Sequence, residues 1–163
     1  MEYMERMMQG MLLRPFILLL TLLLFSGTGH ANMTQDQITF NKLFSAWTLV
    51  FNQKKHHEVC QLFSKSLTSD YQGAPHKNYT KLCDDLKKIL SDNELRYHNR
   101  FKIHQIYRSN DLAAVRITWY LDVYKNGKHL STTQEEGLDI LNKEANGKWK
   151  IVGFLAYPVR NKA

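Results

Sequence analysis

The chain has 163 residues and a net charge of +7, with 44% hydrophobic and 23% charged residues. This length accommodates one domain, and no repeat, low-complexity tract or linker interrupts it. The basic residues are scattered along the chain, which favours a solvated basic surface and argues against a nucleic-acid-binding protein.

Residues 1–31 are predicted to be a signal peptide. Arg14 supplies a positive charge, an apolar run begins at Phe16, and the small-x-small ending "GHA" precedes the expected cleavage site. The run is about half as long as a membrane span. We therefore expect a secreted or periplasmic protein with no stable membrane span after cleavage, and a retained N-terminal anchor is the alternative. The mature domain, residues 32–163, keeps the charge of +7 because cleavage removes two Arg and two Glu.

The first half of the mature domain is predicted to be mainly helical. A helix begins at Thr34, and apolar residues recur with helical spacing over residues 38–51. The next expected elements are a short helix over 56–63, a strand over 66–73 and a helix over about 78–91.

The two cysteines of the sequence, Cys60 and Cys83, both lie in the mature domain. Export permits a disulfide between them, and closing a loop of this size would stabilise the fold by roughly 3 kcal/mol. Two free, buried thiols are the alternative. No metal site is predicted, because the sequence lacks a C-x-x-C motif and the adjacent His56 and His57 would point apart on a helix.

From residue 100 onward the apolar period changes from 3.6 to 2, which indicates strands. The Asn126-Gly127 and Asn146-Gly147 pairs are strong hairpin signals, so the strands should form an antiparallel meander. Helices followed by such a sheet predict an α+β domain with the helices on one sheet face. The four expected strands cover residues 100–107, 113–124, 129–141 and 148–157.

The Asn126-Gly127 turn predicts which acidic side chains of "QEEGLDIL", residues 134–141, face the core. If these two residues form the centre of the turn, Glu136 pairs with Ile117. The face of the strand that carries Ile117 is apolar and should pack against the helices. Glu136 is therefore expected to point inward.

The other two acidic residues of this segment are expected to face solvent. Glu135 and Asp139 flank Gly137, whose missing side chain leaves room for the guanidinium of Arg116 on the facing strand. We interpret this group as surface structure.

An inward carboxylate must be paired, hydrogen-bonded or protonated. The Asn146-Gly147 hairpin pairs Tyr157 with Glu136, so the tyrosine hydroxyl is the expected partner. A desolvated glutamate has a raised pKa and can act as a general acid or base. A wetted position at the open end of the sheet is the structural alternative.

The orientation of His104 depends on the turn at residues 109–111. A two-residue turn pairs His104 with Ile117 and points it inward. A three-residue turn points Ile103 inward, fits the apolar pattern better, and makes His104 a surface residue.

The sequence "LAAVRITWYLDVYKNGKHLSTTQEEGLDILNKEANGKWKIVGF", residues 112–154, and the helix with Trp47 resemble a known group. They resemble the SnoaL-like, ketosteroid-isomerase-like domains of the nuclear transport factor 2 superfamily. The shared pattern is a tryptophan-bearing strand, an N-G turn, a strand with a central glycine and a closing G-x-W-x-I. The resemblance spans essentially the whole mature chain. It implies a cone-shaped fold in which a bent antiparallel sheet wraps around the N-terminal helices, with a pocket at the wide end.

The superfamily includes isomerases, dehydratases, hydrolases and non-enzymatic binding domains. Ketosteroid isomerase uses one Asp as base, with a Tyr and a protonated Asp as oxyanion hole. That set is incomplete here, because the first helix offers Phe44, Trp47 and Phe51 instead of a Tyr, and Asp70-Tyr71 lacks the usual acid-then-proline context. No cofactor is expected, since the chain has no phosphate-binding glycine loop, H-E-x-x-H motif or nucleophile elbow.

Three functions are compatible with these observations. The first is an exported domain that binds a small, apolar molecule through aromatic side chains. The candidate ligand-binding residues are Phe44, Trp47, Tyr71, Phe101 and Trp119.

The second function is an enzyme of isomerase, dehydratase or hydrolase type. Glu136 would be the acid or base, oriented by Tyr157, and Asp70 or His104 would assist. The third is a ligand-free interaction module that forms a homodimer through the outer sheet face. The outward residues expected to suit such an interface are Tyr120, Tyr124, Val152, Phe154 and Ala156.

Overall fold

The computed structural model describes residues 33–159, and the structural statements below concern this part of the chain. The predicted signal peptide, residues 1–31, lies outside it. Within the described part, no helix has the length and apolar character required to cross a membrane. The elements are α3 (Gln35–Asn52), the 3-10 helix η2 (Val59–Leu62), β1 (Phe63–Tyr71), β2 (Lys77–Asn78), α4 (Tyr79–Leu90), β3 (Leu95–Ser109), β4 (Leu112–Lys125), β5 (Lys128–Lys143) and β6 (Trp149–Pro158).

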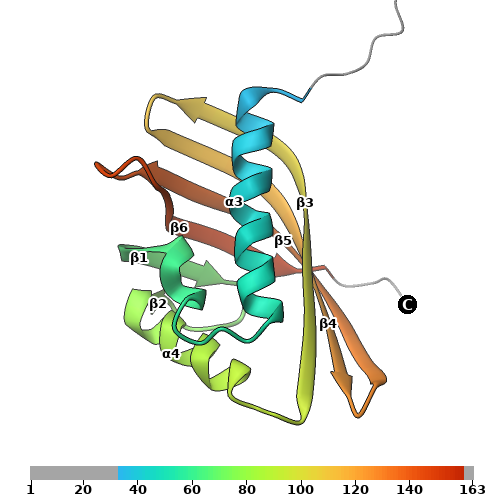
Figure 1. The fold of residues 1–163 in the computed structure, drawn as a ribbon. Coiled ribbons are helices and arrows are strands. Elements are labelled where there is room, and N and C mark those ends of the chain that lie inside the picture. Colours follow the sequence, from blue (N-terminus) through green and yellow to red (C-terminus); the bar gives the residue numbers. More distant parts are fainter. Residues whose placement is uncertain (1–32, 160–163) are drawn as a thin grey trace, which may run out of the picture. The chain divides into compact units, whose positions relative to one another are not determined.

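The strands form one six-stranded sheet in the order β2-β1-β6-β5-β4-β3. Strands β3 to β6 are the predicted antiparallel meander, and β1 joins it in parallel with β6. Figure 1 shows α3 lying against the curved sheet. We call the sheet face covered by α3 the inner face and the opposite one the outer face. The predicted α+β fold is confirmed, and the short strand β2 was not foreseen.

Both long helices begin where the sequence predicts. Thr34 and Gln37 form a capping box at the start of α3, in which each side chain accepts a hydrogen bond from the other residue's backbone N–H. Asn78 caps α4 by accepting from the Lys81 N–H at 3.0 Å. The apolar stripe of α3 places Phe40 and Phe44 in the core against the inner sheet face.

A second core cluster lies at the C-terminal end of α3 and contains the disulfide. Cys60 of η2 and Cys83 of α4 are bonded, as predicted. They pack with Phe51, Val59 and Leu90. The disulfide therefore ties α4 to the segment that follows α3.

Three strands contain one extra residue each, and each such bulge moves the residues beyond it to the opposite sheet face. The extra residues are Leu130 in β5, Val152 in β6 and His104 in β3. The alternation of apolar and polar residues does not reveal them, because apolar residues stand on both faces of these strands. The predicted facing of several side chains is wrong for this reason.

The bulge at Leu130 reverses the facing of "QEEGLDIL". The turn itself forms as expected, with Asn126 at φ 50° and Gly127 at φ 77°, but Ile117 pairs with Gly137 instead of Glu136. Glu136 consequently points outward, beside Thr118.

Glu135 and Asp139, predicted to be surface residues, line a cavity on the inner face together with Gly137. Arg116 is exposed on the outer face and pairs with Leu138. The predicted group of Arg116 with Glu135 and Asp139 is therefore not formed.

The bulge at Val152 reverses the facing of the end of β6. Tyr157 pairs with Glu136 as predicted, but Tyr157 lies on the outer face and is 51% exposed. Phe154 and Ala156, predicted to point outward, line the inner cavity instead. Leu155 takes the outward position and is 55% exposed.

His104 follows neither predicted register. Ser109 pairs with Leu112, so the β3–β4 turn has two central residues. His104 is an extra residue in β3, and Ile103 therefore pairs with Ile117. The imidazole contacts the Thr118 hydroxyl on the outer face.

Candidate functional site

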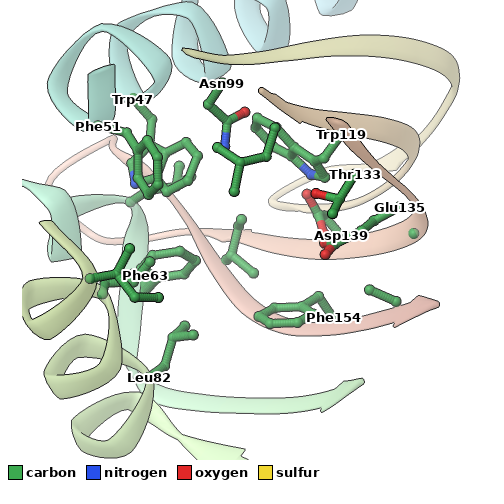
Figure 2. Close-up of a pocket in the computed structure, with 17 residues that line it drawn as sticks. Trp47, Phe51, Phe63, Leu82, Asn99, Trp119, Thr133, Glu135, Asp139 and Phe154 are labelled. Atoms are coloured by element: carbon green, nitrogen blue, oxygen red, sulfur yellow. The ribbon is translucent and has the colours of Figure 1, made fainter. Parts of the chain in front are cut away.

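A cavity of about 230 Å³ lies between the helices and the inner face of the sheet. Figure 2 shows its side chains converging from α3, α4 and the strands. Most of the lining residues are apolar. Ile89 of α4 and Thr133 of β5 are exposed, so the cavity reaches the surface between these elements. The lining residues used below are Trp47, Phe51, Asn99, Trp119, Leu121, Thr133, Glu135, Gly137, Asp139, Phe154 and Ala156.

Trp47 and Trp119 form an aromatic wall of the cavity, as predicted from the sequence. The Trp47 indole N–H donates to the Val59 carbonyl at 2.8 Å, which fixes the ring. The two indole rings meet edge to face with centroids 5.3 Å apart. Phe44 and Phe101 pack behind Trp119, both at 5.5 Å from its ring, and are not among the lining residues.

Asp139 is the most unusual residue of the cavity. Its side chain is 4% exposed, and its Oδ2 has no hydrogen-bond partner. Burial raises the pKa of this carboxyl to about 7, and an interaction with the Trp119 indole only partly opposes this effect. A buried polar atom without a partner costs about 1–3 kcal/mol, so native structures retain few of them.

Glu135 lies two residues before Gly137 on the same strand and is half-buried. Burial raises its pKa, and the Tyr71 hydroxyl, which donates to Glu135 Oε1 at 3.0 Å, counteracts this. The pKa of Tyr71 rises to about 12 through burial and the neighbouring carboxylate. Tyr71 therefore remains a proton donor over the whole physiological range.

Asn99 of β3 contributes another polar group to the cavity. Its backbone is held by Asn52, the last residue of α3: the Asn52 amide donates to the Asn99 carbonyl at 3.0 Å and accepts from the Asn99 N–H at 2.6 Å. The Asn99 side-chain oxygen is buried and has no hydrogen-bond partner.

The four predicted catalytic residues lie elsewhere. Glu136 accepts from the Thr118 hydroxyl at 2.8 Å, and His104 Nε2 is 2.6 Å from the same hydroxyl, all on the outer face. Asp70 is exposed and contacts His76 at 2.9 Å. Tyr157 is outside the cavity as described above. Glu136, His104 and Tyr157 thus lie near one another on the outer face, and none of the four predicted catalytic residues lines the cavity.

Glu135, Asp139 and Asn99 were not predicted from the sequence as cavity residues. One signal was available: Asp139 and Leu141 are two residues apart on the strand and so face the same side of the sheet, and Leu141 is fully buried. This signal was not decisive, because Leu138 and Ile140 face the other side of the sheet and are also apolar. Within residues 33–159 no cluster of His, Cys, Asp or Glu has a geometry that suits a metal ion.

No protein-family model matches the sequence, and no curated protein matches it significantly. Many solved structures do match the fold. A ketosteroid isomerase-like protein from Erwinia carotovora atroseptica has 15% identity and a TM-score of 0.61, covering 79% of this chain and 100% of that one. An NTF-2-like protein of unknown function from Shewanella oneidensis has 20% identity and a TM-score of 0.62, covering 72% and 95%.

A third similar structure is a putative calcium/calmodulin-dependent protein kinase II association domain from Xanthomonas campestris. It has 17% identity and a TM-score of 0.61, covering 82% of this chain and 93% of that one. At such identities the comparison concerns the fold alone. The described domain has the fold shared by ketosteroid isomerase-like and nuclear transport factor 2-like proteins.

Proposed function

We propose that this protein is an exported domain that binds a small, largely apolar molecule in the cavity between α3, α4 and the sheet. The single observation that carries the proposal is the unpartnered Oδ2 atom of the buried Asp139 in a mostly apolar cavity. Ligand sites in proteins combine an apolar lining with a few placed polar groups. The Cys60–Cys83 disulfide supports export, because disulfides persist mainly in oxidising compartments.

The polar groups of the cavity suit a ligand with a hydroxyl or carbonyl group. With a pKa of about 7, Asp139 is partly protonated at neutral pH and can donate or accept a hydrogen bond. Glu135 already accepts a hydrogen bond from the Tyr71 hydroxyl, so it gains less than Asp139 from a hydrogen bond with a ligand. Asp139 is therefore the primary polar contact.

Two measurements test the proposal. The protein purified without detergent should release a small apolar compound on solvent extraction, identified by mass spectrometry against a sample unfolded and refolded in clean buffer. In addition, 4-hydroxybiphenyl should change the fluorescence of Trp47 and Trp119, which line the cavity. If no compound is released and the fluorescence stays unchanged, the proposal is contradicted.

An enzymatic role is the second candidate, and the pKa of Asp139 favours it. General acid–base catalysis is most effective when the pKa lies near the working pH. A carboxyl with a pKa of about 7 in an apolar cavity meets this condition. In such an isomerase, dehydratase or hydrolase, Asp139 would exchange the proton, and Glu135 with Tyr71 would contact the substrate near the opening.

We also propose that the outer sheet face forms a homodimer. Leu155 and Tyr157 stand on β6, a central strand of the sheet, and both are more than half exposed. Exposed apolar side chains grouped on one face are typical of interfaces. They replace Phe154 and Ala156, which the sequence had suggested for this role.

The dimer is testable by sedimentation equilibrium. Leu155→Lys should convert it to a monomer, because a charge would be buried in the interface. Leu112→Lys is the matched control, since Leu112 is similarly exposed but lies at the β3–β4 turn. A wild-type protein that sediments as a monomer at tens of micromolar would refute the proposal.

A further inference from the structure

Two buried side-chain atoms in the described part of the chain lack a hydrogen-bond partner, and both belong to residues that line the same cavity. They are Asn99 Oδ1 and Asp139 Oδ2. Most buried polar atoms in proteins are satisfied, and each exception needs an explanation. Their occurrence in one cavity indicates that the cavity's occupant supplies both missing partners.

Asn99 cannot easily turn its backbone away from the cavity. β3 is an edge strand of the sheet, and the side chain of Asn52 holds both the N–H and the carbonyl of Asn99. Figure 2 shows Asn99 entering the cavity from β3, while Asp139 enters from β5. The two polar groups therefore approach from separate strands.

One small polar group cannot reach both orphaned atoms. Asn99 pairs with Leu121 of β4, and Asp139 pairs with Val115 of the same strand. These partners are six residues apart, which corresponds to about 20 Å along a strand. The curvature of the sheet makes the straight line between the two side chains shorter than this path along the strand. Two hydrogen bonds of about 3 Å each take up part of it, which leaves room for a ligand roughly 10 Å long.

The space between the two ends is apolar. Trp119 of β4 lies between them, Leu121 lies beside Asn99, and both line the cavity. The volume of about 230 Å³ equals that of about eight water molecules at about 30 Å³ each. The cavity thus suits a narrow apolar skeleton, such as two linked rings or a medium-length chain.

We propose that the ligand is an elongated apolar molecule with a hydroxyl group at each end, one bonded to Asn99 Oδ1 and the other to Asp139 Oδ2. The inference rests on the proposed small-molecule function and adds the chemical class of the ligand. A hydroxyl donates to Asn99 Oδ1. It donates to the Asp139 carboxylate when this group is ionised, and it can accept from the carboxyl when this group is protonated. Asn99 is then the residue that selects two-ended ligands.

Three probes with one skeleton test this inference: biphenyl, 4-hydroxybiphenyl and 4,4′-dihydroxybiphenyl. Their dissociation constants are measured by calorimetry and tryptophan fluorescence. The wild-type protein should bind the diol about tenfold more tightly than the mono-ol, and the mono-ol more tightly than biphenyl, because each added hydroxyl satisfies one buried atom. The variant Asn99→Leu should bind the diol and the mono-ol within about twofold of each other.

Asn142→Leu is the matched control, since Asn142 is exposed on β5 and does not line the cavity; it should keep the wild-type preference. Asn99→Leu should also raise the urea midpoint of unfolding, which shows that the variant is folded and that the oxygen was unsatisfied. Equal binding of all three probes would overturn the two-ended ligand and leave the proposed function intact. Binding of none would overturn both, and a diol preference that survives in Asn99→Leu would overturn the role of Asn99.

Discussion

Replacing Asp139 with Asn should make the protein progressively more stable than the wild type as the pH rises from 4 to 7. Burial raises the pKa of Asp139 from 3.8 to about 7 in the folded protein. Between these values the unfolded chain has lost the proton and the folded protein still holds it. The free energy of unfolding of the wild type therefore falls by about 1.4 kcal/mol per pH unit in this window.

The total loss attributable to Asp139 is about 4 kcal/mol above pH 7, and it vanishes below pH 4, where both states are protonated. Asn does not titrate, so any fixed cost of the buried amide is independent of pH. Urea unfolding at pH 5, 6, 7 and 8 measures the difference between the two proteins.

Asp84→Asn serves as control for this experiment, because Asp84 is an exposed carboxylate on α4. Its difference from the wild type should stay constant across the same pH values. A difference between Asp139→Asn and wild type that does not grow from pH 5 to pH 7 would show that Asp139 is not the buried carboxyl described here.

Replacing Ala156 with Phe should weaken binding of 4-hydroxybiphenyl by tenfold or more, which corresponds to at least about 1.4 kcal/mol. Ala156 lines the cavity next to Gly137, so a phenyl group at this position occupies the space of the ligand. Fluorescence titration measures the dissociation constant, and thermal unfolding verifies that the variant is folded.

The neighbouring residue provides a strict control. Leu155→Phe adds an aromatic ring on the outer face of the same strand and should leave the dissociation constant unchanged. The two variants also test the bulge at Val152, since a regular β6 strand would point residue 155 into the cavity and residue 156 away from it. Stronger loss of binding in Leu155→Phe than in Ala156→Phe would show that the strand is regular.

Local signals in the sequence predicted the elements well. The helix start at Thr34, the helical stripe with Phe44 and the Asn126-Gly127 turn act over a few residues and are confirmed. Such signals need no knowledge of distant contacts. Of the five aromatic residues predicted to bind a ligand, Trp47 and Trp119 line the cavity, and Phe44, Tyr71 and Phe101 do not.

The acidic residues of the site were predicted wrongly for a specific physical reason. One extra residue, Leu130, inverts every side chain from Ser131 to the end of β5. In "QEEGLDIL" both parities contain acidic and apolar residues, so either facing satisfies the alternation rule. Asn99 was missed because its role depends on Asn52, 47 residues earlier in the chain.

The sequence by itself determined the α+β class, the start of the first helix, the Asn126-Gly127 turn and the aromatic composition of the core, and it favoured the pairing of Cys60 with Cys83. Only the tertiary structure decided that Asp139 and Glu135 face the helices and that Glu136 faces away. The physical reason is that a bulge is selected by packing over the whole sheet. The buried side chains of β3, β4 and β6 and the stripe of α3 must fit together at once, and no short stretch of sequence contains that condition.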